Sequence, residues 1–274
     1  MKRLLAVLLV GSAGSTACKT AQNYLDPRGP MYTGSLAAQP RPAGDSLLVV
    51  SFNVEYALHV DQALVALRSH PRLVDADLIA LQEMDAPGTE TLARGLGLNY
   101  VYYPAALHPQ TKRDVGDAIL TPWPIEATFK LPLPHKSRGL GQSRAAVGAL
   151  VRVGDRVVRV YSLHLGSPFG ASPGQRRDQI DVVLCDARES PDPVVIAGDF
   201  NSSGLGSRLE AAGYTWLTRG IGATTHRFSF DHVFVRGALF GDATAGAVRD
   251  VKEASDHRPV WARIRVLGLP ATSR

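Results

Sequence analysis

The feature that most constrains the fold of this chain is a set of short apolar segments that each end in a polar residue. Leu47–Asn53, Leu78–Glu83 and Val194–Asp199 run from aliphatic side chains into an amide or a carboxylate. Runs of this length and composition are typical of buried strands. Polar groups at the ends of such strands are held rigidly enough to act on a substrate. We therefore expect these strand ends to converge on one rim of the fold.

Strands and helices alternate along the rest of the chain, which indicates an α/β fold in one domain without internal repeats. The Gly154-Asp155 pair separates two apolar runs and predicts a hairpin. Apolar residues at helical spacing predict helices over 61–68, 89–96, 175–189 and 207–212. The remaining strands are expected over 100–104, 118–120, 127–131, 145–153, 156–164, 230–235 and 259–266.

The two ends of the chain differ in composition from the predicted domain, which we place at residues 46–267. Residues 1–18 resemble a signal peptide, with two basic residues, a short apolar run and small residues before Cys18. The residues before Cys18 resemble a bacterial lipobox, in which the cysteine is acylated, and ordinary secretory cleavage is the alternative. Residues 19–45 contain several prolines and no periodicity, so we expect a flexible tether, and 268–274 form a C-terminal tail.

Composition places the chain among globular proteins and excludes a disulfide framework. Of the 274 residues, 45% are hydrophobic and 20% are charged. The net charge of +5 favours polyanionic partners only weakly, because Lys2 and Arg3 belong to the predicted signal peptide. If Cys18 is acylated or removed, Cys185 has no partner in the chain, and we expect it to be a small packing residue.

The segment Gly198-Asp199-Phe200-Asn201 follows an apolar strand and contains two polar side chains two residues apart. In an extended chain both point to the same side. A carboxylate there can accept a proton from water or bind a hard cation, and the amide can orient the water. The alternative is an Asx-type turn that only ends the strand.

A second segment, Ser255 to Val260, places Asp256 and His257 directly before another apolar strand. Sequence neighbours rarely bond each other along a strand, so each is expected to have its own partner. A histidine near a phosphate can donate a proton or stabilise charge. The alternative is a capped turn with a surface histidine.

These segments, taken in order, resemble the endonuclease/exonuclease/phosphatase superfamily over about residues 46–267. The resemblance rests on the segments Ser51-Phe52-Asn53-Val54, Leu81-Gln82-Glu83, Gly116 to Ile125, Ser162-Leu163-His164, Gly198 to Asn201, Phe230 to Phe234 and Ser255 to Val260. It implies a four-layer α/β/β/α sandwich, with two packed mixed β-sheets flanked by helices and the site at one end of the sheets.

The resemblance also implies a role for each of these polar residues. The residues that would hold a divalent metal are Asn53, Glu83 and Asp256, and Asp256 has a partnership with a histidine as its alternative. The residues that would perform catalysis are His164, Asp199, Asn201, Asp231 and His257. Asp199 and Asn201 would position or deprotonate water, His257 and His164 would contact the phosphate, and Asp231 would orient a histidine. Carboxylate-rich, cysteine-poor ligands suit Mg²⁺ or Mn²⁺, and nothing in the sequence has zinc spacing.

Three positions need separate interpretation. Asp117 stands where the family commonly has Asn, and a substrate contact, an extra metal or histidine partner, and a harmless exchange remain open. Arg144 enters a strand and is expected to contact the substrate phosphate, with a solvated edge arginine as the alternative. We expect His232 to be structural or to support a neighbouring site residue, with a direct role in the site as the alternative. Arg176 and Arg177 begin a helix and are expected to be surface charges.

The sequence therefore predicts an exported, metal-dependent hydrolase of phosphate esters, with Mg²⁺ or Mn²⁺ as cofactor. A phosphodiester is an anion, and its hydrolysis needs a cation, hydrogen-bond donors and a base for water. We expect a monomer, nucleic acid as the first substrate and a phospholipid head group as the second. A non-catalytic binding protein on the same fold is the alternative of another class. We expect it in the cell envelope, anchored to the membrane through Cys18, or secreted to the periplasm or beyond.

Overall fold

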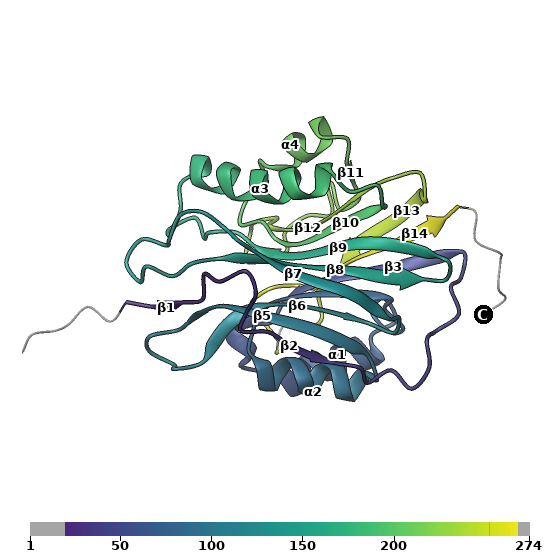
Figure 1. The fold of residues 1–274 in the computed structure, drawn as a ribbon, viewed down its shortest axis with the longest axis horizontal. Coiled ribbons are helices and arrows are strands. Elements are labelled where there is room, and N and C mark those ends of the chain that lie inside the picture. The colour runs from purple at the N-terminus through teal and green to yellow at the C-terminus, as the bar shows by residue number, and fades with distance from the viewer. Residues whose placement is uncertain (1–19, 252, 268–274) are drawn as a thin grey trace, which may run out of the picture.

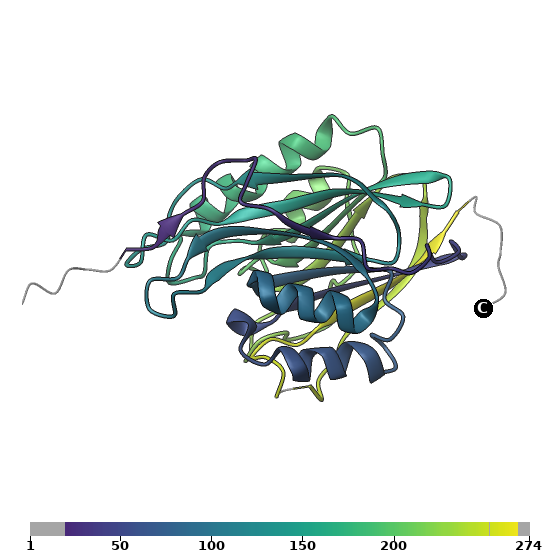
Figure 2. The same cartoon turned by 60° about the horizontal axis from the view of Figure 1, so that its bottom comes forward.

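The computed structural model describes residues 20–251 and 253–267 and shows two β-sheets packed face to face. Helices cover the outer face of each sheet, so the molecule has the four layers α/β/β/α that the sequence predicts (Figure 1). Turning the molecule brings α1 and α2 forward, where they lie against the outer face of one sheet (Figure 2). Within the described residues, no helix has the length and apolar character needed to cross a membrane.

The larger sheet has eight strands in the order β1-β5-β6-β4-β3-β14-β13, with β2 also paired to β5. Strands β3 and β4 are parallel and the other pairs are antiparallel, so the sheet is mixed. Its strands are β1 (Gln22–Asn23), β2 (Tyr32–Gly34), β3 (Ser46–Asn53), β4 (Leu78–Met84), β5 (Asn99–Leu107), β6 (Asp114–Thr121), β13 (Phe240–Ala247) and β14 (Val260–Val266).

The smaller sheet has six strands in the order β11-β12-β10-β9-β8-β7. Strands β9 and β10 are parallel, and their carboxyl ends deliver His164 and Asp199 side by side. Its strands are β7 (Ile125–Pro132), β8 (Ala145–Val153), β9 (Arg156–His164), β10 (Val194–Asp199), β11 (Thr215–Trp216) and β12 (Asp231–Arg236).

The helices are η1 (Glu55–Ala57), α1 (Val60–Ser69), α2 (Ala86–Leu96), α3 (Pro173–Arg188) and α4 (Gly206–Ala211). Two of the helices, α2 and α3, begin at residues whose side chains cap them. Ser172 and Gln175 form a reciprocal capping box at the start of α3. Helix α2 starts at Asp85, whose carboxylate accepts from Gly88 N, and ends at Gly97 in the left-handed conformation (φ 66°).

The central strands are apolar on both faces because each face packs against another layer. In β3, Leu47 and Val49 lie in the core between the sheets, whereas Leu48 and Val50 pack in a second core with α1 and α2. A third core lies between the smaller sheet and helices α3 and α4. This double burial explains why the segments read as continuous apolar runs without alternation.

A buried polar link joins the two sheets near their polar ends. Gln82 Nε2 on β4 donates to Ser162 Oγ on β9 over 3.0 Å, and Ser162 Oγ donates back to Leu81 O over 3.0 Å. Ser51 Oγ on β3 also donates to the Gln82 amide oxygen. A satisfied network of this kind fixes the register of one sheet on the other.

Several predicted elements differ from the structure at the edges of the sheets. Strand β13 has no counterpart in the sequence prediction, because Phe240–Ala247 contains few large apolar side chains and is largely exposed. The prediction of a flexible tether over residues 19–45 is wrong for the described residues, since β1 and β2 pair with β5. Strands of two and three residues interrupted by proline leave no periodic signal. Residues 1–19, which include Cys18, and the tail 268–274 lie outside the described residues.

Two side chains on α3 also differ from expectation. Cys185 is exposed and not packed in the core. Arg176 is buried, and its Nη1 donates to Ala171 O over 2.8 Å as well as to Gly166 O and Ser167 O. Helical periodicity cannot distinguish a buried arginine that binds backbone carbonyls from one in solvent.

The N-terminal segment is fixed by a buried lysine on β7. Lys130 is 1% exposed, and its Nζ donates to Tyr24 O over 3.1 Å and to Gly29 O over 2.8 Å. The K130M substitution should lower the free energy of unfolding of the full chain by about 2 kcal/mol, because it leaves two buried carbonyls unpaired. In a chain lacking residues 1–34 it should cost less than about 0.5 kcal/mol, the size of a surface effect.

Urea unfolding followed by tryptophan fluorescence measures both differences. Equal costs of K130M in the two chains would contradict the anchoring role of this lysine.

Candidate active site

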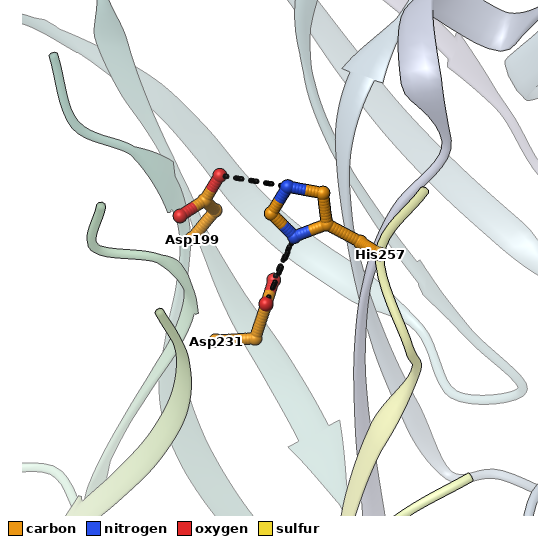
Figure 3. Close-up of side chains that lie close together, drawn as sticks. All are labelled: Asp199, Asp231 and His257. Atoms are coloured by element: carbon orange, nitrogen blue, oxygen red, sulfur yellow. Dashed lines mark hydrogen bonds and ion pairs between the residues drawn. The ribbon is translucent and has the colours of Figure 1, made fainter. Parts of the chain in front are cut away.

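The candidate site lies where the polar ends of β3, β4, β9, β10 and the start of β12 meet. The structure brings together all of the predicted catalytic residues at this end of the sandwich. Asp199, Asp231 and His257 form its centre, and Figure 3 shows His257 lying between the two carboxylates. The strand ends therefore converge on one rim of the fold, as the sequence predicts.

Asp199 has more close polar contacts than the other side chains of the site. Its Oδ2 accepts from Asn53 Nδ2 over 3.2 Å and from Asn201 Nδ2 over 3.3 Å, and His164 Nε2 lies 3.4 Å away. Its Oδ1 accepts from Asn201 N over 2.8 Å. Burial, and next the charge of Asp231, raise the pKa of Asp199 to about 7 in spite of His257. A carboxylate with this pKa can exchange a proton near neutral pH.

The position of Asp199 depends on the glycine before it. A Cβ atom at Gly198 would lie 2.0 Å from Leu163 O on the neighbouring strand, so only glycine permits this approach of β10 to β9. Beyond the strand, Asn201 adopts a left-handed backbone (φ 48°), and its side chain donates to Leu165 O as well as to Asp199. The segment thus has the turn geometry that the sequence left open, but its side chains point into the site.

Asp231 and His257 form a buried carboxylate–imidazole pair. His257 Nδ1 lies 2.9 Å from Asp231 Oδ2 and 3.1 Å from Oδ1, while its Nε2 lies 3.8 Å from Asp199 Oδ2. Burial alone would lower the pKa of His257, but the charge and hydrogen bond of Asp231, with help from Asp199, raise it to about 10. The imidazolium form is therefore favoured at neutral pH, and Nε2–H is available to donate.

Two more polar residues lie beside this centre. Glu83 is on β4 of the larger sheet, and His164 is on β9 of the smaller sheet. Glu83 Oε2 accepts from Tyr56 N over 3.1 Å, and its Oε1 lies 3.7 Å from His164 Nδ1. Burial raises the pKa of Glu83 against the opposing charges of Arg144 and His257. Burial also lowers the pKa of His164 well below its usual value, so the ring is neutral. Among the described residues, His164 Nδ1 has no hydrogen-bond partner.

The donor set of the site fits a hard divalent cation. Glu83 supplies a carboxylate that is only 12% exposed, and Asn53 supplies an amide oxygen that also accepts from Glu55 N. Oxygen ligands of this kind are those that Mg²⁺ and Mn²⁺ prefer. Ligand atoms of Asp199, Asp231 and His257 also lie within 4.8 Å of one another. In that trio His257 Nδ1 is already used in its hydrogen bond to Asp231, whereas the oxygen atoms of Glu83 and Asn53 keep a free lone pair for a cation.

The other predicted residues lie around this centre. Asp256 is exposed, and its charge acts on Glu83 and His257 from the edge of the site. Asp117 is buried, its carboxylate accepts from the backbone of His164, and burial raises its pKa well above the usual value. Arg144 is partly exposed at the mouth of the site, close enough to act on the charges of Glu83 and Asp117.

Arg144 and His232 both differ from ordinary surface side chains, the first in its lack of partners and the second in its burial. Within residues 20–251 and 253–267, the Arg144 guanidinium has no hydrogen-bond or ion-pair partner, so it is free to bind a ligand. His232 is buried beside Trp216, whose Nε1 donates to His232 Nδ1 over 3.3 Å. Burial lowers the pKa of His232 to about 4, and the ring points away from the site toward aromatic side chains.

Sequence reasoning did not single out three residues that hold the site together. Ser255 Oγ donates to Asn53 O over 2.7 Å and accepts from His257 N, so it links the two segments. Glu55 Oε2 accepts from Asp256 N, and Tyr56 presents its backbone N–H to Glu83. Ser255 lies within a segment that was recognised, whereas the left-handed turn over Glu55–Ala57 leaves no signal in its side chains.

Comparison with known proteins agrees with this geometry. The sequence profile of the Endonuclease/Exonuclease/phosphatase family matches residues 50–257. A protein of Escherichia coli (strain K12), Uncharacterized protein YbhP, is 25% identical over 234 residues, which span 74% of this chain and 88% of YbhP.

Solved structures show the same fold at lower identity. The endonuclease/exonuclease/phosphatase from Beutenbergia cavernae DSM 12333 has a TM-score of 0.66 and 20% identity, and covers 84% of this chain and 74% of its own. D. rerio TDP2 complexed with single strand DNA product has a TM-score of 0.61 and 18% identity, with coverage of 80% and 99%.

The environment of Glu83 predicts that E83Q raises the melting temperature in the absence of a cation and removes the stabilisation that a cation provides. In a chelator, E83Q should melt at a higher temperature than the unsubstituted protein, because a neutral amide removes a buried charge and can donate to His164 Nδ1. Added Mg²⁺ or Mn²⁺ should stabilise the unsubstituted protein, by about 2.7 kcal/mol at a hundredfold excess over Kd. It should leave E83Q unchanged.

Differential scanning calorimetry with a cation titration provides the measurement. The matched control is E90Q, which replaces an exposed carboxylate on α2 that pairs with Arg94 and lies outside the site. An equal cation-dependent shift in E83Q would place the cation elsewhere.

Proposed function

Because the chain belongs to the endonuclease/exonuclease/phosphatase family, we propose that it hydrolyses phosphate esters with the help of a divalent cation, as a phosphodiesterase. One observation supports this proposal above the others. His257 is held by Asp231 on one side and directed at Asp199 on the other, so a protonated donor and a proton acceptor face the same small space. Hydrolysis of an ester needs both groups near the phosphorus.

A cation belongs to the proposed chemistry, and Glu83 with Asn53 would hold it, assisted by Asp256. Bound there, it would offset the negative charge of the ester and of the departing oxygen. The chain itself supplies further charge compensation, since Arg144 has no side-chain partner in the part of the chain that the structure describes and can form a fork with a phosphate.

The residues divide the proton transfers between them. Asp199, with a pKa of about 7, accepts the proton of the attacking water, and Asn201 and Asn53 keep its carboxylate in position. His257 donates Nε2–H to a phosphoryl oxygen as negative charge grows there, while Asp231 keeps the ring protonated and oriented. His164 is neutral and lies on the far side of Asp199, where its Nε2 can hold a second contact.

Nucleic acid is the first substrate class that we propose, and a phospholipid head group is the second. The similarity to D. rerio TDP2, which was solved with a single strand DNA product, supports the first. Exposed apolar side chains on segments that adjoin the site, such as Leu58 and Phe169, support the second. Asp117 lies against the backbone of His164, which favours a positioning role for this carboxylate over direct contact with substrate.

The proposal extends to location. The leader-like residues 1–18, with a lipobox-like sequence ending at Cys18, support export and an envelope lipoprotein or secreted form. A non-catalytic binding protein would tolerate gaps in the polar set, and the complete set of Asn53, Asp199 and His257 argues against it.

The contact between Asp231 and His257 predicts that substitutions of these two residues have non-additive effects on kcat. With bis(p-nitrophenyl) phosphate and Mg²⁺, D199N and H257Q should each lower kcat by about 10²–10⁴-fold, since each removes one proton-transfer partner. D231N should lower kcat strongly in the unsubstituted protein but have little further effect in H257Q, because Asp231 acts through the imidazole.

Circular dichroism and melting temperature control for folding in each variant. A D199N protein that is folded and retains a near-normal rate would refute the role of Asp199 as base. Absence of turnover in the unsubstituted protein with Mg²⁺ and with Mn²⁺ would favour the binding protein.

A further inference from the structure

Three loops around the site each expose a large apolar side chain. Phe169 is 94% exposed, Leu58 is 52% exposed and Phe228 is 49% exposed. Single exposed apolar residues are common on protein surfaces, but three on segments that adjoin one site need a cause.

Each of these side chains lies next to a residue of the site. Leu58 follows the turn that presents Tyr56 N to Glu83. Phe169 lies in the loop that directly follows His164 on β9. Phe228 lies in a loop that is bridged to His257 through Thr225. The three apolar groups therefore stand on separate segments, each of which adjoins a residue of the site.

Hydrogen bonds from helix α3 fix the loop of Phe169, so the ring is exposed because of the conformation of the loop. Arg176 donates to three carbonyls of this loop, and Gln179 Oε1 accepts from Gly166 N over 2.8 Å. Phe228 is likewise supported, since its ring stacks on Phe230 at 5.0 Å with an interplanar angle of 4°. Neither ring is directed inward to fill the core.

Cationic side chains accompany these apolar groups. Arg138 N donates to Gly170 O over 3.0 Å, which places the connection from β7 to β8 beside Phe169. This connection, residues 133–144, contains Lys136, Arg138 and Arg144 and no acidic residue, and the Phe169 loop, 165–172, contains none either. Arg227 lies over the ring of Phe228. We call Leu58, Phe169, Phe228, Lys136, Arg138 and Arg227 the apolar-basic rim.

The N-terminal end of the described chain leaves the molecule at the same rim. Ala21 N donates to Leu140 O over 2.8 Å, and Asn23 Nδ2 donates to Gly141 O over 2.9 Å. Figure 1 shows β1 at the end of the sandwich where the chain passes from β7 to β8. The sequence that precedes this point contains Cys18, the residue proposed for acylation.

We propose that the apolar-basic rim docks on an anionic lipid bilayer, with the mouth of the site facing the membrane. Aromatic and aliphatic side chains insert at the level of the head groups, while lysine and arginine bind lipid phosphates. A nucleic acid would use the cations and the stacked phenylalanines, but it offers no partner for Leu58. An anchor at Cys18 would hold the same face toward the lipid. The proposal adds an interaction surface and is independent of the proposed reaction.

Tryptophan reporters can locate the membrane contact within the full chain. The C18S variant serves as the background, and F169W is compared with V65W, in which an exposed apolar residue on α1 is replaced outside the rim. Vesicles of phosphatidylglycerol with brominated acyl chains are added in a chelator, so that no turnover occurs. Quenching of F169W, with no change in V65W, is the expected result. The leader is identical in both proteins and cannot produce this difference.

Charge removal and a nucleic-acid arm complete the test. K136Q with R138Q should weaken the apparent vesicle affinity of F169W about fivefold for each charge removed, as head-group attraction requires. R156Q, at the β8–β9 turn far from the rim, should not. Equal quenching of V65W and F169W, or none in either, would overturn the proposal. So would a response of F169W to single-stranded DNA and not to vesicles, which would assign the rim to nucleic acid.

Discussion

The hydrogen bond from the Asn53 amide to the Asp199 carboxylate joins the two sheets at the point where the site forms. Asn53 ends a strand of the larger sheet and Asp199 ends a strand of the smaller one. Unless the sheets meet in this register, the donors of one cannot compensate the carboxylate of the other. The Gln82–Ser162 link lies behind it and fixes the same register through a fully paired network.

The arrangement concentrates charge and strain in one small region. Burial raises the pKa of both Glu83 and Asp199, so holding these groups ionised opposes folding. Left-handed backbone conformations occur at Glu55–Ala57, Glu83 and Asn201, beside the same groups. The cores on both sides of each sheet supply the stability that tolerates this cost. The site is thus pre-organised by the packing around it and does not depend on local sequence preference.

In this fold the central polar residues and the loops that surround them are separate features. The central residues define a reaction class that a common scaffold supports in many proteins. The loops that surround them differ in what they expose, and here they expose Phe169 and Phe228 with basic neighbours. The segment before β3 adds to this surface, because it is fixed on β5 and not free as a tether.

The sequence by itself determined the alternation of strands and helices and the polar residues at the strand ends, while the four layers were implied by its resemblance to a known family. Double-sided burial makes each central strand an apolar run, and a polar group such as Glu83 or Asp199 at its end is conspicuous. The sequence did not determine the edge strands of the larger sheet, because β13 and the short strands β1 and β2 have too few apolar residues to show a period. Nor did it determine that Arg176 is buried, that Cys185 is exposed, or that four groups gather within 4 Å of Asp199 Oδ2. Those features depend on which distant segments become neighbours, and only the packing of the two sheets decides that.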